Sequence, residues 1–480
     1  MQTLLKQENT LPLIQAPMTL LKPTLSHNKV LSSLICGLRP IDYRIIAGLQ
    51  PDEKILRKHL LIITIENILK AAKTNQWSLC MNDGQLFIYN SEYWGLIGKP
   101  ELISFLGKAA EALGVDKYDS RWHAFQADLL KQFMSTAYLP RPKKQSNEVL
   151  INLMNGTFAI TPGNQAIRNF DHVDFLTYQL PFSFDATATA PVFSNYLNKV
   201  LPDAEQQKIL AEYAGYIFIK QKTLKLEKAL ILYGNGANGK SVFFEILTAL
   251  LGSENVSNYS LGTLTNDNGY FRAKLGTKLL NYGSEISANM DAAKFKLLVS
   301  GEPIDARLPF GEPFILTDYA KLIFNCNSLP KDVEHSEAFF RRFLILHFNV
   351  TIPEQDRNPE LAINIIGDEL AGVFNWVLDG LKRLLLNKKF TQSDLVDKTL
   401  GSYRLESDAV LRFLSEDGYE PHLNHEVPLK ALHKEYVTFC GEAGLRVCSI
   451  SAFAERLRNA GFDTHRKNAG VIVYISKKII

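Results

Sequence analysis

Cysteine is scarce in this sequence, long apolar runs are missing, and the net charge is close to zero. The five cysteines among 480 residues show no C-x-x-C spacing, which argues against a zinc site or a disulfide framework. No apolar run reaches the ~18 residues of a membrane span, and the start of the chain lacks the apolar core of a signal peptide. A formal charge of +3 is too small to indicate nucleic-acid binding by the whole chain. We therefore expect a cytoplasmic protein without membrane contact, in which any DNA-binding surface is local.

One segment, GNGANGKS, has the spacing G-x-x-x-x-G-K-[ST] of a phosphate-binding loop. The apolar run 229–233 before it predicts a buried strand, and the sequence from residue 242 predicts a helix. Glycines let backbone N–H groups converge on phosphate oxygens, and the helix N-terminus favours an anion. Lys240 is then expected to contact the β- and γ-phosphates of ATP, and Ser241 to bind Mg²⁺. The predicted nucleotide-binding residues are Gly234, Asn235, Gly236, Ala237, Asn238, Gly239, Lys240 and Ser241.

Three downstream segments supply polar residues that ATP hydrolysis needs. A short apolar strand leads to Glu285, which is expected to hold Mg²⁺ and polarise the attacking water; a surface carboxylate is the alternative. Asn327 follows another apolar strand and is expected to orient that water, unless it only forms a turn. Arg341 and Arg342 are flanked by apolar residues and must face a cleft or an interface, because a guanidinium is not buried unpaired. One of the two is expected to act as an arginine finger in a neighbouring subunit, with a structural salt bridge as the alternative.

Residues 301–314 combine Pro and Gly with flanking β-formers and predict a hairpin inserted in the core. Arg307 and Phe310 on this hairpin, with Lys296 before it, are candidates for holding single-stranded DNA through phosphate charge and aromatic contact. An ordinary connecting hairpin is the competing interpretation.

The chain from residue 391 predicts a smaller unit with a winged-helix order: a helix over 427–440, a second over 452–460 capped by Ser449, and a strand over 470–475. Residues 430–480 hold nine basic and four acidic residues, a local balance of +5. The candidate DNA-binding residues are Arg456 and Arg458 on the second helix, with Arg466 and Lys467 in the wing. A winged helix that binds another protein through a solvated basic face is the alternative.

Taken in order, these segments resemble superfamily 3 helicases of the phage/plasmid-type and poxvirus-type primase-helicase family. The resemblance rests on GNGANGKS, KLLNYGSE, SGEPIDAR, KLIFNCNSLP and FFRRFLILHF, with lead-in similarity near 151–158 and 174–178. It implies an α/β fold with a P-loop AAA+-like ATPase core and a winged-helix C-terminal domain. The domains implied are an N-terminal arm (1–50), a mixed α/β lead-in or collar domain (51–200), the ATPase core (201–390) and the C-terminal domain (391–480).

The resemblance further implies an ATP- and Mg²⁺-dependent DNA helicase that acts as a homo-oligomeric, usually hexameric, ring on single-stranded or forked DNA. Its role would lie in replication of a phage, plasmid or other mobile element. By this resemblance, Lys240 and Ser241 would hold the phosphates and Mg²⁺, Glu285 would be the acid and Asn327 the sensor. Arg341 or Arg342 comes from the next subunit.

Two departures from the family pattern matter. Gly311-Glu312 stands at the hairpin tip, where related proteins tend to carry a basic residue. The early acids are dispersed and form no D-x-D pair, so we expect no primase activity and a separate primase or polymerase as partner. The alternative function is a P-loop ATPase switch, or an origin-binding initiator that binds DNA without unwinding it.

Overall fold

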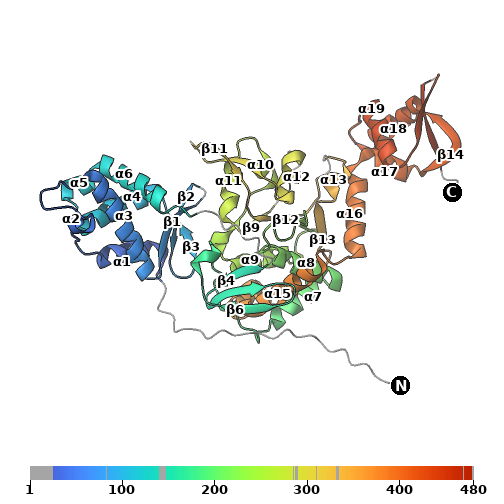
Figure 1. Cartoon of the computed structure of the whole chain (residues 1–480). Helices are drawn as coiled ribbons and strands as arrows, with labels where there is room; N and C mark the ends of the chain where they lie inside the picture. The colour runs from blue at the N-terminus through green and yellow to red at the C-terminus, as the bar shows by residue number, and fades with distance from the viewer. Residues whose placement is uncertain are drawn as a thin grey trace.

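The computed structural model describes residues 25–82, 84–139, 148–284, 286, 290–309, 311–330, 334–468 and 470–477. These residues form three lobes in a row, which we call the N-terminal lobe (25–139), the central lobe (148–407) and the C-terminal lobe (409–477) (Figure 1). Glu285 and Phe310, two of the predicted site residues, lie outside the described residues.

The N-terminal lobe is a helical bundle with a small antiparallel sheet, and one hydrophobic cluster that includes Leu106 and Phe133 forms its core. Apolar residues at helical spacing place one face of each long helix in this cluster. The helices are α1 (His27–Gly37), α2 (Tyr43–Ile46), α3 (Arg57–Thr74), α4 (Lys99–Ala112), α5 (Lys117–Arg121) and α6 (His123–Thr136). The strands are β1 (Ser78–Asn82), β2 (Gln85–Tyr89) and β3 (Trp94–Leu96).

The expectation of an arm over residues 1–50 is wrong for the part that the structure describes. Helices α1 and α2 bury Val30, Leu34 and Tyr43 in the core of the N-terminal lobe. Tyr43 shares a 2.8 Å hydrogen bond with Thr64 of α3. The apolar pieces in this region are too short to reveal their helical spacing, and tertiary packing decides their structure.

A second antiparallel sheet, expected within the lead-in domain, packs on the central lobe. Ile151 and Phe158 of this sheet share a hydrophobic cluster with Leu230 and Leu344 of the parallel sheet described next. In the structure, the predicted lead-in domain (51–200) is therefore divided between the N-terminal and central lobes. The strands, in spatial order, are β4 (Val149–Leu153), β5 (Gly156–Ile160) and β6 (Gln165–Arg168).

A five-stranded parallel sheet organises the central lobe, with the order β13-β7-β12-β9-β8. Alternate residues of β7 face two different cores: Leu230 and Leu232 join one cluster, and Ala229 and Ile231 join another. Both faces are thus covered, as is usual for parallel sheets. The strands are β7 (Ala229–Tyr233), β8 (Val256–Ser257), β9 (Leu280–Gly283), β12 (Lys321–Cys326) and β13 (Phe343–His347).

Helices cover this sheet, and one antiparallel hairpin projects from it (Figure 1). Gly380 permits the close crossing of two long helices, since a Cβ atom there would lie 2.3 Å from the Ala211 backbone. The helices are α7 (Pro191–Val200), α8 (Ala204–Tyr216), α9 (Lys240–Leu251), α10 (Leu261–Thr265), α11 (Tyr270–Ala273), α12 (Ala292–Ser300), α13 (Glu337–Phe340), α14 (Leu361–Asp368), α15 (Leu370–Asn387) and α16 (Asp394–Ser407). The hairpin, which was predicted, consists of β10 (Ile304–Arg307) and β11 (Pro313–Leu316).

The C-terminal lobe has its own small core, which includes Phe413, Tyr436 and Phe453. The predicted cap is confirmed: the Ser449 hydroxyl accepts the backbone N–H of Ala452 at 3.3 Å. The helices are α17 (Ala409–Glu416), α18 (Leu429–Ala443) and α19 (Ile450–Asn459). The antiparallel sheet, in the order β14-β16-β15, consists of β14 (Tyr419–Pro428), β16 (Gly470–Lys477) and β15 (Thr464–Lys467).

Among the described residues, no single helix has both the length and the apolar character needed to cross a membrane. One pair, Glu354–Asp368 with Leu370–Asn387, meets the criteria only jointly and is bent by 80° at its break.

Candidate functional site

The loop GNGANGKS connects β7 to α9, as the motif requires. β7 is flanked by β12 and β13 and is buried except at its last residue, Tyr233. The loop therefore leaves the carboxyl edge of the sheet and enters the N-terminus of a twelve-residue helix. This placement directs backbone N–H groups and the positive end of the helix dipole toward one point.

The backbone of the loop needs two left-handed residues and a close contact with α7. Gly239 has φ +86° and Ala237 has φ +60°. A Cβ atom on Gly239 would lie 2.7 Å from Val200, so only glycine fits here. Tyr196 of α7 donates its hydroxyl to the Gly239 carbonyl at 2.8 Å. Helix α7 thus packs against the loop at Gly239.

Lys240 is buried and its ammonium contacts neutral oxygen atoms. It donates to the Gly234 carbonyl at 2.5 Å and to the Asn238 side-chain oxygen at 2.9 Å. Burial lowers the pKa of Lys240. Asn238 in turn donates to the Phe348 carbonyl at 3.0 Å, which ties the loop to the segment after β13. A charged amine held by neutral acceptors at a helix N-terminus is suited to bind an anion.

The carboxyl ends of β9 and β12 lie at the same edge of the sheet as the loop. Asn327 is exposed one residue beyond β12. Asn325 lies on the same side of β12 as Asn327, because side chains alternate along a strand. Its side-chain oxygen accepts a hydrogen bond from the Tyr282 hydroxyl at 3.1 Å. Glu285 lies outside the described residues, so the structure places only the strand that leads to it.

Cys326 lies between these asparagines on the opposite side of β12 and is buried near Lys240. Burial raises the pKa of its thiol to about 12, and the nearby ammonium of Lys240 opposes this only in part. The thiol is therefore neutral and acts as a small apolar group under the loop.

The two predicted finger residues have different surroundings. Arg342 is 8% exposed; its guanidinium donates to the Ser300 hydroxyl at 3.0 Å and to the Ala338 carbonyl. Arg341 has a side chain that is 57% exposed and approaches Glu227 at 3.3 Å. Arg342 is thus held within the subunit, whereas Arg341 is at the surface.

Glu227 links this pair to the loop before β7. Burial tends to raise the pKa of its carboxyl, but the positive charges of Lys225, Arg342 and Arg341 outweigh burial and hold the pKa below its usual value. The carboxylate is therefore charged near neutral pH and keeps the arginines oriented at the start of β13.

On the predicted DNA-contacting hairpin, Arg307 is exposed and its guanidinium lies 5.7 Å from the centre of the Tyr270 ring. Lys296 is instead paired with Glu334 at 2.9 Å. Sequence reasoning missed Arg272, which is fully buried and holds the hairpin base through Asp305 at 2.7 Å. A single arginine in a polar stretch gives no signal of such burial.

The predicted basic face of the C-terminal lobe is partly neutralised within the chain. Arg456 pairs with Asp408 at 3.2 Å, and Lys467 pairs with Glu426 at 2.5 Å. Arg458 and Arg466 are exposed, and the Arg458 guanidinium donates to the Thr464 hydroxyl at 3.4 Å. Arg458 and Arg466 could therefore contact DNA without the loss of the ion pairs that hold Arg456 and Lys467.

Two family models match parts of this chain. Residues 54–202 match the family model described as "D5 N terminal like". Residues 232–342, which begin at the end of β7 and finish at Arg342, match a "Family of unknown function (DUF5906)".

Two solved apo structures of the NrS-1 C-terminal region are similar to this chain. The A form has 14% sequence identity and a TM-score of 0.50, and the match covers 85% of this chain and 98% of that one. The other has 14% identity and a TM-score of 0.48, with 87% and 99% covered. At this identity the likeness is one of fold. Residues 54–202 are therefore similar to the D5 N-terminal-like family, and the chain resembles the NrS-1 C-terminal region in its overall fold.

Proposed function

We propose that this protein is an ATP-dependent DNA helicase that works as a homo-oligomeric ring with ATP bound between subunits. One observation carries the proposal: Lys240 lies at the carboxyl edge of the parallel sheet, and the exposed Arg341 lies at its amino edge. β13 is five residues long, which separates the two edges by about 17 Å. Arg341 cannot reach its own loop over this distance, but the same residue of a neighbouring copy is free to do so.

The residues at the loop fit ATP and Mg²⁺. Lys240 is a buried cation with neutral partners, and a phosphate would supply the missing negative charge. The exposed Ser241, the second residue of α9, is placed to hold Mg²⁺. Bound Mg²⁺ would supply charge neutralisation at the β- and γ-phosphates.

The proposed mechanism divides hydrolysis between two subunits. Asn327 orients a water molecule for in-line attack on the γ-phosphate, with Glu285 as its polarising acid. Lys240 stabilises the charge on the phosphates, and Arg341 of the neighbouring copy completes the site. Hydrolysis then requires assembly. In a ring, each subunit receives Arg341 from one neighbour and supplies its own Arg341 to the other.

The remaining parts of the molecule support a role on DNA. In the C-terminal lobe, α17, β14, α18, α19 and the pair β15–β16 follow in the order of a winged helix, so we propose DNA binding there. The match to a D5 N-terminal-like domain and the fold similarity to the NrS-1 C-terminal region support a phage-type replication protein.

The second candidate is an origin-binding initiator or ATPase switch that does not unwind DNA. The hairpin favours it, because Leu308 and Ile315 are 48% and 62% exposed and Glu312 is acidic, which does not suit a phosphate backbone. Strand displacement on a forked substrate distinguishes the two functions, with Lys240→Ala as the inactive control. Steady ATP hydrolysis by the assembled protein without any displaced strand would sink the helicase proposal.

A further inference from the structure

Residues 334–337, which we call the junction segment, lie between the predicted sensor Asn327 and the exposed Arg341. Glu334 accepts two hydrogen bonds from Lys296 of α12, at 2.9 and 3.0 Å. At the other end, the Ser336 hydroxyl caps α13 by accepting the Phe339 backbone N–H at 3.2 Å. The position of Arg341, one residue beyond α13, therefore depends on how this segment is held.

Helix α16, which leads to the C-terminal lobe, contacts the same region. Its Tyr403 donates a hydroxyl to the Pro330 carbonyl at 3.0 Å and packs edge-on against Phe340 of α13. Its Arg404 pairs with Glu337 at 2.7 Å. Arg404 also lies over the Phe340 ring, 5.5 Å from its centre. Two adjacent side chains, Tyr403 and Arg404, thus connect α16 to α13 and to the segment before it.

Asp408 is the residue at which the two lobes meet, and its side chain is 5% exposed. One oxygen accepts the Val410 backbone N–H at 2.8 Å, which caps α17, and also contacts Arg456 of α19 at 3.2 Å. The other oxygen lies 3.6 Å from Nδ1 of His335 in the junction segment. A single buried carboxylate therefore joins α19, the start of α17 and the junction segment.

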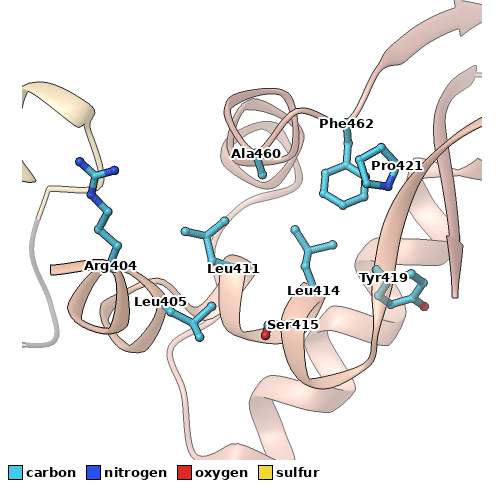
Figure 2. Close-up of a pocket in the computed structure, with 10 residues that line it drawn as sticks. Arg404, Leu405, Leu411, Leu414, Ser415, Tyr419, Pro421, Ala460 and Phe462 are labelled. Carbon is cyan, nitrogen blue, oxygen red and sulfur yellow. The ribbon is translucent and has the colours of Figure 1, made fainter. Parts of the chain in front are cut away.

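Next to Asp408, the C-terminal lobe and α16 are separated by an open, mainly apolar groove of about 440 Å³ (Figure 2). In Figure 2, Leu405 of α16 and Leu411 of α17 lie along it, while Phe462 lies across the space from α16. The groove leaves the C-terminal lobe room to move as a rigid body about Asp408, because no packed side chains fill the space.

We propose that Asp408 is a positioning residue through which the C-terminal lobe sets the position of the junction segment and of Arg341. DNA bound to the C-terminal lobe shifts α19, Arg456 carries this shift to Asp408, and α16 with His335 passes it to α13. ATP hydrolysis then responds to DNA held at the far end of the chain. The effect on hydrolysis rests on the proposed function, whereas the mechanical link does not.

The test compares Asp408→Asn, Arg456→Ala and Arg456→Lys in the full chain. Asparagine still caps a helix, so Asp408→Asn removes the charge and keeps the start of α17. Arg456→Lys keeps the positive charge opposite Asp408. The matched control is Arg412→Ala on α17, which breaks an ion pair with Glu416 that does not involve Asp408.

The first measurement is backbone hydrogen exchange over residues 334–342 without nucleotide or DNA. The amides of Phe339, Phe340 and Arg341 donate within α13 and report on its order. We expect about tenfold faster exchange of these amides in Asp408→Asn and Arg456→Ala, with partial recovery in Arg456→Lys and no change in the control. Unchanged exchange in both disrupting variants, or an equal effect of Arg412→Ala, overturns the proposal.

The second measurement is the kcat and KM of ATP hydrolysis with and without a random-sequence DNA duplex. Loss of the link is expected to abolish the change in kcat on adding DNA, while KM for ATP stays within about twofold of wild type. A general loss of structure would change both constants, and a DNA response that persists in Asp408→Asn contradicts the link. If the wild-type protein hydrolyses no ATP, the proposed function fails and the exchange measurement still decides the link.

Discussion

Lys240 and Arg341 lie at opposite edges of one sheet, because β7 and β13 run parallel with Ala229 beside Phe343 and Tyr233 beside His347. The loop lysine follows the carboxyl end of one strand, and the exposed arginine precedes the amino end of its neighbour. A site that uses both residues must therefore be built from two copies of the chain. This relationship makes assembly a condition of the proposed chemistry.

Mixing two inactive variants tests the shared site. Lys240→Ala and Arg341→Ala are each expected to lower ATP hydrolysis by at least about 100-fold. In an equal mixture, a loop from the arginine variant can meet an arginine from the lysine variant. Random assembly then restores about a quarter of the sites, which a steady-state ATPase assay detects. No recovery in a mixture that is shown to co-assemble would falsify the shared site.

Replacing Arg341 with alanine is expected to lower ATP hydrolysis, whereas replacing Arg342 with alanine is expected to lower stability. Arg341→Ala removes an exposed side chain, so kcat falls while the melting temperature stays near wild type. Arg342→Ala leaves the Ser300 hydroxyl and the Ala338 carbonyl without their partner, which costs about 2–3 kcal/mol of stability. Thermal unfolding beside ATPase kinetics separates the two effects. The assignment of Arg341 as the finger is wrong if Arg341→Ala keeps full activity in an assembled ring.

Local pattern was sufficient to predict the parts of the fold that rest on strong spacing. The strand before the loop, the helix after it and the Ser449 cap depend on signals within ten residues of each other, and all three are present. The difference between Arg341 and Arg342 was not predictable. Neighbouring arginines look alike in sequence, and only the three-dimensional contact with Ser300 shows which one is held inside.

Contacts over long sequence separations account for what sequence reasoning missed. Tyr196 donates a hydrogen bond to Gly239, which is forty-three residues away in the sequence. Asp408 contacts His335 of the central lobe and Arg456 of the C-terminal lobe. No periodicity or motif links such residues, because each pair is fixed by how helices pack. The prediction of an N-terminal arm was wrong for the same reason, because α1 is stabilised by its packing in the core of the N-terminal lobe.

The charges of the C-terminal lobe predict a graded effect on DNA binding. Arg466→Ala removes a cation that is exposed, so the slope of log K against log salt concentration is expected to fall by about 1. Lys467→Ala removes a cation that Glu426 already neutralises at 2.5 Å, and its effect should be less than half as large. Fluorescence anisotropy of a labelled duplex over a range of salt concentrations measures both slopes. An equal loss of slope in the two variants would show that the Glu426 ion pair does not persist on DNA.

Lys321 predicts a dependence of stability on pH that is independent of nucleotide. It is the first residue of β12, is 7% exposed, and places its ammonium 4.2 Å from the centre of the Tyr216 ring. Burial lowers the pKa of Lys321 from 10.5 to about 8, against a smaller opposing effect of Asp318. Below pH 8 the lysine is charged in the folded and unfolded protein alike, and the full cost of burying the charge is present. Between about pH 8 and 10.5 the folded protein loses this proton first, so its contribution to stability rises with pH.

Replacing Lys321 with methionine keeps the apolar stem and removes the charge, so the variant should be more stable than wild type at pH 7. The expected gain is about 1–3 kcal/mol, which is the cost of the lowered pKa less the attraction to the Tyr216 ring. The gain should shrink as pH rises toward 10.5, because the folded wild-type protein releases the buried proton and so escapes the cost of burying the charge. Urea unfolding at several pH values measures this difference, and Lys222→Met, at an exposed position, serves as the control. A gain that stays constant from pH 7 to 10 would show that the Lys321 charge is not what burial penalises.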